Sequence, residues 1–437
     1  MEHSVTIDGR RCRGCTTCIK ICPTESIRVR DGQAAILSER CIDCGSCIRV
    51  CPHRAIYSAA DPLSAMDRFS VRVAVPDPVL YGQFGQLSDV GQILTGLERL
   101  GFQRVFEPAR SAELLADQTA RQKKSGPFPR ISSGCPAVLR LIRLRFPHLI
   151  DHVEPVMLSM EFAAIQARRV MAEETGLPPE EIGVFAIVPC AAKVTAARKP
   201  EGLERPVLDG AFSIQELCLE LVRIMPPQGG TDRSTAAGRG GISTAFSGGE
   251  GALRGERCAL AVDGIRNVIE MLEEVEDGRQ NGVEFLELWA CTQGCVGGRL
   301  NVENPYVARM HLSALAAELP QRGKGEVGKD QAWDDVTFTR TCNTVPPSSW
   351  TRTGRRPWKS TGASTRWPSS CRGSTAGPAA RRTAGRSPRM WCRGEQRKPT
   401  VSFSLRRKTS PPAFRLRSCG GKRDKNAYKR DKKDALP

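Results

Sequence analysis

The sequence lacks any apolar stretch long enough to cross a bilayer, and it does not begin with anything that resembles a secretory signal. We therefore expect a cytoplasmic protein with no membrane partner. Aromatic residues make up only 5% of the 437 residues, whereas cysteine occurs 18 times. In a chain without an export signal, so many thiols favour metal ligation over disulfide bonds. This length predicts two or three domains.

Acidic residues are scarce in only one part of the chain. Residues 341–437 hold 25 Lys and Arg against 4 Asp and Glu, a net charge of +21, while the whole chain carries +18. The first 340 residues are therefore mildly acidic, which is ordinary for a soluble protein. The basic excess belongs to this C-terminal tail alone.

The tail also lacks isoleucine and has only three leucines, so we predict that it is disordered. Three explanations compete: a basic tail that binds nucleic acid, an anchor for anionic lipid, and translation of GC-rich DNA in the wrong frame. No amphipathic period supports the lipid anchor. We favour the third hypothesis, because an overlapping frame of DNA that encodes residues 371–381 can read Leu-Pro-Gly-Leu-Asp-Cys-Gly-Ser-Cys-Gly-Ala. In that case the tail cysteines are not ligands; they are Cys342, Cys371, Cys392 and Cys419.

Two copies of one cysteine spacing occupy the first sixty residues. Each is C-x2-C-x2-C-x3-C followed by proline, and the copies begin at Cys12 and Cys41. This spacing is typical of two-cluster ferredoxins, in which the fourth cysteine of each motif ligates the other cluster. We predict an α+β ferredoxin-like domain over residues 1–60 with two [4Fe–4S] clusters that transfer electrons. The first cluster is assigned to Cys12, Cys15, Cys18 and Cys51, and the second to Cys22, Cys41, Cys44 and Cys47.

Strand and helix patterns alternate over residues 70–325, which predicts an α/β domain with largely parallel sheets. Strands are expected at 69–76, 104–106, 182–188, 258–262 and 283–289. Helices are expected at 86–102, 111–122, 137–146, 155–174, 213–224, 264–276 and 305–319. Residues 226–256 are rich in Gly, Ser and Arg and are expected to form an exposed loop.

Four cysteines of this domain lie just after predicted strands, namely Cys135, Cys190, Cys291 and Cys295. In open α/β sheets, sites gather outside the carboxyl ends of the strands. Four thiols that arrive there from three loops suit an iron–sulfur cluster. The alternative is that they are inert buried cysteines, which we expect instead for Cys218 and Cys258.

With these loops in order behind the ferredoxin motifs, the chain resembles the [FeFe]-hydrogenase family. The segments that start at Ser132, Val188 and Glu287 match its signatures T-S-C-C-P-x-W, M-P-C-x-x-K-x-x-E and E-x-M-A-C-x-x-G-C-x-x-G-G. The resemblance implies that the four cysteines hold the [4Fe–4S] part of an H-cluster. Cys295 would also bridge to a di-iron subsite that carries CO, cyanide and a dithiolate. Lys193 would donate a hydrogen bond to a cyanide.

The reaction that the resemblance implies is H2 ⇌ 2 H+ + 2 e−, with Lys193 and Cys295 in catalytic roles. Electrons would leave through the ferredoxin clusters to a redox partner such as ferredoxin. Hydrogenase maturation proteins would be needed to load the site. If the di-iron subsite is present, the chain is a ferredoxin-type hydrogenase-like oxidoreductase.

Several residues depart from the family pattern. Gly134 replaces the cysteine that passes protons to the di-iron site, and Ala196 replaces a glutamate on the same route. Val188 and Trp289 replace two methionines of the di-iron pocket, and Val138 replaces a tryptophan. Positioned proton transfer is worth about 10²–10⁴-fold, so we expect slow turnover. These changes resemble the sensory branches of the family, which favours an H2- or redox-responsive protein with a signalling partner.

Two functions of other classes stay open. The same cysteines could hold only a [4Fe–4S] cluster, as in an electron-transfer or cluster-assembly protein; Gly134 fits this alternative, whereas Lys193 and Pro189 favour a di-iron pocket. A nucleic-acid-binding protein would rest on the tail alone, and we do not expect that partner. It predicts binding that falls steeply with salt and vanishes on truncation at residue 341.

Overall fold

The computed structural model describes residues 3–85, 89–121, 126–227, 230–279, 282–321 and 337–338. These residues all belong to one compact unit, Met1–Lys359. The tail from residue 341, with its four cysteines, lies outside the described residues, as do all the predictions made for it.

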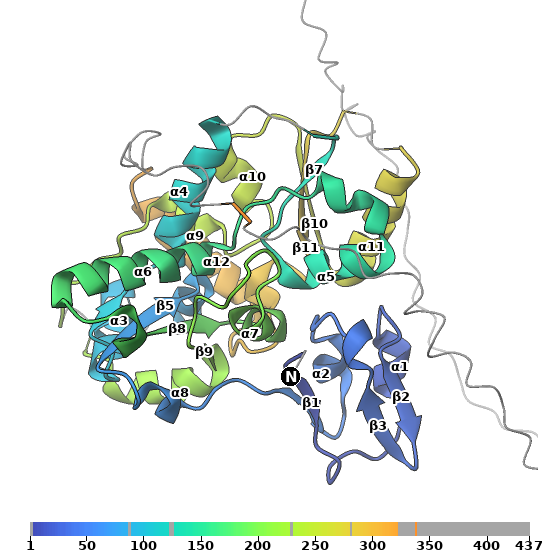
Figure 1. Cartoon of the computed structure of the whole chain (residues 1–437), viewed down its shortest axis with the longest axis horizontal. Coiled ribbons are helices and arrows are strands. Elements are labelled where there is room, and N and C mark those ends of the chain that lie inside the picture. The colour runs from blue at the N-terminus through green and yellow to red at the C-terminus, as the bar shows by residue number, and fades with distance from the viewer. Residues whose placement is uncertain are drawn as a thin grey trace, which may run out of the picture. The chain divides into compact units, whose positions relative to one another are not determined.

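The N-terminal domain is built from two strand pairs and two short helices (Figure 1). Both pairs are antiparallel: β1 with β4 and β2 with β3. The bounds are β1 Val5–Ile7, α1 Thr17–Ile21, β2 Ile27–Arg30, β3 Gln33–Ile36, α2 Ser46–Val50 and β4 Ile56–Ser58. Gly14 and Gly45 have φ of +63° and +69°, which glycine adopts without steric cost where the chain turns into each helix. The predicted α+β ferredoxin-like fold is confirmed.

A four-stranded parallel sheet in the order β6-β5-β8-β9 forms the larger layer of the second domain. Its strands are β5 Val71–Pro76, β6 Arg104–Val105, β8 Ile182–Val188 and β9 Gly210–Ser213. Every residue of β8 is buried, as expected for a central parallel strand. Val184 and Ala186 face one core cluster, whereas Phe185 and Ile187 face another. Helices therefore cover both faces of this sheet.

A second parallel sheet has the order β10-β11-β7, with β11 in the middle. Its strands are β7 Arg130–Ile131, β10 Ala259–Asp263 and β11 Phe285–Trp289. Leu286 and Leu288 of β11 pack into a core that also contains Leu141 and Val268. The predicted α/β domain with parallel sheets is confirmed.

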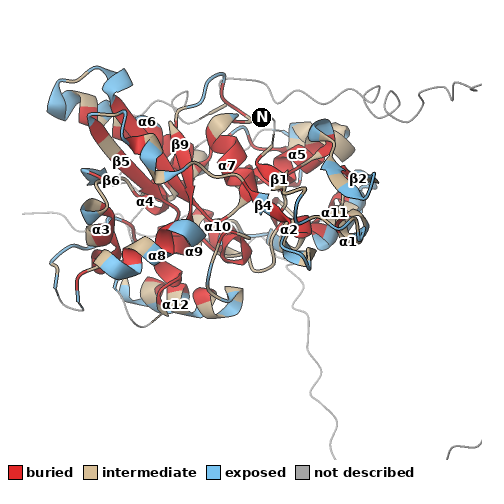
Figure 2. Cartoon of the chain, turned by 90° about the horizontal axis from the view of Figure 1, so that it is seen from below, coloured by how far each residue is buried: buried red, intermediate tan, exposed pale blue. Residues whose placement is uncertain are grey.

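Ten helices of the described residues surround the two sheets, and Figure 2 shows how their buried faces turn inward. They are α3 Val90–Arg99, α4 Pro108–Arg121, α5 Pro136–Arg145, α6 Ser159–Thr175, α7 Ala191–Arg198, α8 Ile214–Ile224, α9 Arg239–Ser243, α10 Gly249–Arg254, α11 Ile265–Glu276 and α12 Pro305–Glu318. Helix α6 begins four residues later than expected. Strands β7 and β9 and helix α7 are too short for their patterns to have been recognised.

Two expectations were wrong. Residues 226–256 are not one exposed loop, because they contain α9 and α10, and Ile242, Ala245 and Arg254 there are buried. Their small residues permit close packing: a side chain at Gly241 or Gly249 would collide with neighbouring backbone. Cys258 is exposed, not buried, because it precedes β10 instead of lying within it, whereas Cys218 of α8 is buried as expected.

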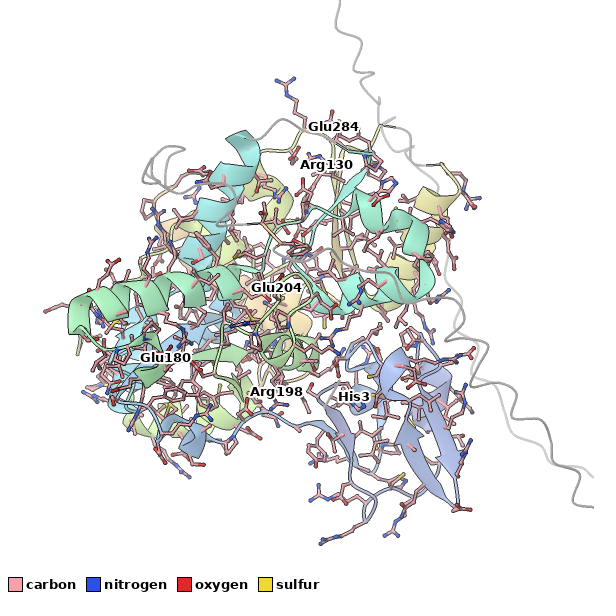
Figure 3. The ribbon with its side chains drawn as sticks, in the orientation of Figure 1. His3, Arg130, Glu180, Arg198, Glu204 and Glu284 are labelled. Carbon is pink, nitrogen blue, oxygen red and sulfur yellow. The ribbon has the colours of Figure 1, made fainter. Side chains whose placement is uncertain are left out.

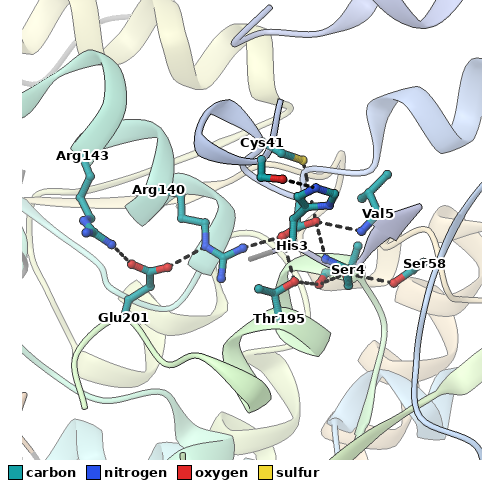
Figure 4. Close-up of polar contacts among 12 residues, drawn as sticks. His3, Ser4, Val5, Cys41, Ser58, Arg140, Arg143, Thr195 and Glu201 are labelled. Carbon is teal, nitrogen blue, oxygen red and sulfur yellow. Dashed lines mark hydrogen bonds and ion pairs between the residues drawn. The ribbon is translucent and has the colours of Figure 1, made fainter. Parts of the chain in front are cut away.

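The two domains are joined by the buried carboxylate of Asp43, which lies between Cys41 and Cys44 (Figure 4). Its Oδ2 accepts hydrogen bonds from Arg140 Nη1 of α5 at 2.6 Å and Thr195 Oγ1 of α7 at 2.8 Å. Its Oδ1 accepts two from the backbone of β1 and the residue before it, each at 3.2 Å. Because α5 and α7 begin directly after Cys135 and Cys190, this clasp ties the ferredoxin loop to helices that carry predicted ligands.

We predict that Asp43→Ala lowers the free energy of unfolding by about 3–5 kcal/mol, because removing one partner of a buried ion pair leaves the other groups unsatisfied. Guanidinium unfolding of the anaerobic protein measures the change. Glu39→Ala, at an exposed position of the same domain, is the matched control and is expected to change it by less than about 0.5 kcal/mol. Equal losses in the two variants would contradict the role of the clasp.

Candidate metal centres

Eight cysteines of the N-terminal domain line two separate cavities. Cys12, Cys15, Cys18 and Cys51 line one, and Cys22, Cys41, Cys44 and Cys47 line the other. The helices explain the exchange: each carries one cysteine in its first turn, Cys18 or Cys47, and ends at a cysteine that faces the other cavity. Each cavity therefore has four thiols, the donor set of a [4Fe–4S] cluster.

Backbone groups are already directed at several of these sulfurs. Ser26 N–H donates to Cys22 Sγ at 3.2 Å, and Ala34 and Ala55 N–H donate to Cys12 and Cys51 Sγ at 3.3 Å. Such hydrogen bonds stabilise negative charge on sulfur and are among the factors that set cluster potentials. The fit of this domain to two clusters thus extends beyond the number of thiols.

The structure also brings Cys135, Cys190, Cys291 and Cys295 together. Cys135 and Cys190 are the residues before the first turns of α5 and α7, Cys291 follows β11, and Cys295 begins the short 3-10 helix Cys295–Gly297. The charges of Cys190 and Cys135 act on both Cys291 and Cys295. The two helix N-termini favour thiolates at Cys135 and Cys190.

Burial opposes ionisation of these thiols in the bare protein. It raises the pKa of Cys190 to about 11, although the charge of Lys193 acts in the opposite direction. Burial also raises the pKa values of Cys291 and Cys295 above the usual thiol range. Bound metal cations reverse this preference, because a coordinating thiol is deprotonated. The group is therefore suited to a metal cluster and poorly suited to free thiolates.

A cavity of about 80 Å³ lies beside Cys295, lined also by Asp77, Gly134, Lys193 and Trp289. Lys193 Nζ forms a buried ion pair with Asp77 Oδ2, and Asp77 follows the carboxyl end of β5. Burial alone would lower the pKa of Lys193, but the charges of Asp77 and the nearby thiols outweigh it and raise that pKa. The cavity wall thus carries a permanent ammonium that can hold an anionic group of a ligand.

Glu250 of α10 occupies the space beside Gly134. A Cβ atom at position 134 would lie 3.2 Å from Glu250 Oε2 and from Ser132 Oγ. Ser132 Oγ donates a hydrogen bond to the same carboxylate oxygen at 2.5 Å. Burial, followed by the charge of Glu287, raises the pKa of Glu250 to about 7, although Arg254 opposes the shift. A titratable group near neutral pH therefore lines the cavity where residue 134 has no side chain.

Buried charges fix the position of Glu250. Arg254 Nε lies 3.2 Å from Glu250 Oε1, and its Nη1 pairs with Glu154 at 2.5 Å. Arg130 of β7, which Figure 3 labels, pairs with Glu154 as well and with Glu256 at 2.8 Å. This network holds the C-terminal end of α10 against β7.

Glu287 of β11 holds the other end of α10. Its carboxylate accepts hydrogen bonds from Gly248 N–H at 3.0 Å, Gly251 N–H at 2.8 Å and Trp289 Nε1–H at 2.7 Å. The same carboxylate therefore orients both Glu250's helix and the Trp289 ring that lines the cavity.

The sequence motifs located the cysteines and Lys193, but Asp77, Glu250 and Glu287 were missed as site residues. Asp77 had one usable signal, because a carboxylate directly after a buried parallel strand lies where sites gather. Glu287 stood inside the third signature without an assigned role. Glu250 gave no signal, because it lies in the segment taken for an exposed loop.

Comparison with known proteins agrees with this arrangement. Residues 71–223 and 245–299 match the family "iron only hydrogenase large subunit, C-terminal domain", and residues 4–52 match the 4Fe-4S dicluster domain. The chain is 24% identical to iron hydrogenase 1 of Clostridium pasteurianum over 415 residues, which cover 78% of this chain and 72% of that protein.

It is 30% identical over 220 residues to the periplasmic [Fe] hydrogenase large subunit of Nitratidesulfovibrio vulgaris, which cover 46% of this chain and 52% of that one. A solved apo [FeFe]-hydrogenase from Chlamydomonas reinhardtii superposes with a TM-score of 0.47 at 18% identity, over 60% of this chain and 91% of that chain. A superposition at this level adds nothing to the assignment.

These domains define an iron–sulfur protein with a ferredoxin-type and a hydrogenase-type part. The chain belongs to the iron-only hydrogenase large-subunit family, of which it is a divergent member at these low identities. In the part of the chain that the structure describes, we find no helix long and apolar enough to cross a membrane.

We predict that Cys18→Ala and Cys47→Ala each remove one [4Fe–4S] signal from the electron paramagnetic resonance spectrum of the dithionite-reduced protein, because each cavity loses one of four donors. Cys218→Ala, at a buried cysteine of α8, is the control and leaves the spectrum unchanged. If one substitution removes both signals while the chain stays folded by circular dichroism, the two cavities are not independent sites.

Proposed function

We propose that the chain is a low-turnover hydrogenase-like protein that interconverts H2 with protons and electrons and serves to sense H2 or redox state. The observation that carries the proposal is the cavity between Cys295 and the Lys193–Asp77 ion pair, next to four thiols. A protein that needed only a [4Fe–4S] cluster would have no use for a buried ammonium beside it. When bound, a di-iron subsite supplies the metal chemistry that forms and splits H2.

The residues of the chain would then divide the work. Cys135, Cys190, Cys291 and Cys295 would hold the cluster, and Cys295 would also reach the di-iron subsite. Lys193 would donate a hydrogen bond to an anionic ligand of that subsite, and Asp77 would keep the ammonium in place. The surrounding residues are mostly apolar, including Leu115, Met157 and Leu253, and they exclude water.

The proton would be handled by the Glu250 carboxyl group. It faces the position where the family's relay cysteine has been replaced by Gly134, and its pKa of about 7 suits both uptake and release of a proton. Ser132 bridges the two positions through its hydroxyl group, which donates to Glu250 and accepts from Gly134 N–H at 3.0 Å. A carboxyl from another element would thus replace the missing thiol.

Electrons would pass through the N-terminal domain. The charge of Cys44 acts on Cys291, so the second ferredoxin cavity adjoins the third group of thiols. At the other end of the domain Cys15 is exposed, and Arg13 and His53 line its cavity. A basic rim around an exposed cluster suits an acidic redox partner such as a ferredoxin. Maturation proteins and a signalling partner complete the proposal.

The deciding measurement is infrared spectroscopy of anaerobic protein produced together with the hydrogenase maturation proteins. Iron-bound CO and cyanide absorb in a region where protein does not. We expect such bands, and we expect them to shift when H2 replaces nitrogen. Iron–sulfur clusters without these bands would contradict the proposal and favour the electron-transfer or cluster-assembly alternative.

We predict that Glu250→Gln lowers H2 evolution by about 10²-fold or more, because the amide cannot transfer a proton. In the unsubstituted protein, evolution needs the protonated carboxyl, so its rate falls as the pH rises through about 7; H2 oxidation needs the carboxylate and rises over the same range. The variant loses both dependences. Rates are measured with a viologen dye as the electron carrier.

Glu161→Gln is the matched control, because burial also raises the pKa of Glu161 to about 7 but its side chain does not line the cavity. It is expected to keep both the rate and the pH profile. Unchanged profiles in Glu250→Gln, with its infrared bands intact, would show that protons take another route.

A further inference from the structure

A second cavity, of about 200 Å³, lies at the junction of the two domains and takes no part in the function proposed above. The ferredoxin domain contributes Cys44, Ser46 and Arg49 to its wall. The second domain contributes the first turn of α11, the loop after β11 and Arg299. The cavity is distinct from the one beside Lys193, with which it shares no residue.

The charge on its wall is of one sign. Three arginines line it, Arg49, Arg266 and Arg299, and no aspartate or glutamate does. Within the described ranges, none of their guanidinium groups has a hydrogen bond or an ion pair. By contrast, the buried guanidinium groups of Arg130 and Arg254 are paired with carboxylates.

Arg299 shows that this charge is uncompensated. Its Nε–H is buried and has no acceptor. Burial, together with repulsion from Arg49, lowers its pKa, and the thiols of Cys291 and Cys44 only partly offset this. Its aliphatic stem packs on Gly45, where an added Cβ would lie 2.8 Å from Arg299 Cγ, so the side chain cannot turn away toward solvent. A buried donor without an acceptor is costly, and an anion in the cavity would satisfy it.

Helix α11 adds donors to the same wall. It has twelve residues, and Gly264 before its first turn provides no capping side chain. The N–H groups of the first turn are therefore free to bind a ligand, and the helix dipole favours negative charge at this end. The cavity lining includes the residues of this turn, Ile265, Arg266 and Asn267, and the hydroxyl-bearing Thr292.

We propose that this junction cavity binds a phosphate group, either as free phosphate or as part of a nucleotide. Phosphate is the anion that planar guanidinium groups and free helix N–H groups recognise together. The arginines come from both domains, Arg49 from one and Arg266 and Arg299 from the other, so the bound ligand also holds the two domains together.

The site lies between Cys44 and Cys291, which belong to neighbouring groups of thiols. A bound dianion neutralises the arginines that stabilise added electrons on either side, so occupancy lowers the reduction potentials of the flanking clusters. This regulatory part rests on the proposed electron path, whereas the binding itself does not.

The test is anaerobic titration calorimetry of the full iron-loaded chain with inorganic phosphate and, separately, with ADP, both in a chloride buffer. We expect saturable binding that weakens at least about tenfold in Arg266→Gln and in Arg299→Gln, since each removes charge-assisted hydrogen bonds. Arg257→Gln, at an exposed arginine outside the cavity, is the control and leaves binding unchanged. Tighter binding of ADP identifies a nucleotide site, and equal binding identifies free phosphate.

The absence of saturable binding, or binding that none of the cavity variants weakens, overturns the proposal. Arg266 is exposed, so its substitution cannot fail merely by unfolding the chain. The result is independent of the infrared bands, because a chain without a di-iron subsite can still bind phosphate at this junction.

Discussion

The burial of one carboxylate, that of Asp43, decides how the two iron–sulfur parts of this protein meet. A carboxylate with no exposed side-chain surface is stable only when every acceptor position is used, and here the donors come from both domains. Because Asp43 stands between two cysteines of one metal site and its partners stand on helices that begin at two cysteines of another, the domain contact and the spacing of the centres are a single structural property. Arg140 extends the contact to Glu201 at 2.6 Å, and Arg143 also pairs with that carboxylate.

The same principle, buried charge held by defined partners, governs the cavity beside Cys295. Lys193 is kept charged by Asp77, and Glu250 is kept near neutrality by burial while Arg254 and Ser132 orient it. A permanent cation and a titratable carboxyl thus face one another across a small apolar space. Removing the side chain at position 134 has not emptied the site of acid–base groups, since a different helix supplies one.

The sequence predicted most of what depends on local pattern. The cysteine spacings, the buried strand β8 and helices such as α11 follow from motifs and apolar periods that lie within a few residues. Asp43 and Glu250 could not be predicted, because their partners lie 97 and 118 residues away and nothing in their neighbourhood marks them. The glycine-rich segment misled for a related reason: glycines such as Gly241 and Gly249 were taken as signs of an open loop, yet they permit backbone to pack against backbone.

The exchange of cysteines between the two N-terminal motifs has a consequence for biosynthesis. Neither four-thiol cavity is complete until Cys51 and Cys22 have crossed to the opposite motif, so a nascent chain that has emerged only as far as residue 40 holds no finished site. Iron delivered at that stage would meet three thiols and an open position. Cluster insertion into this domain must therefore follow synthesis of both motifs, and loss of either motif from a truncated gene product would abolish both centres at once.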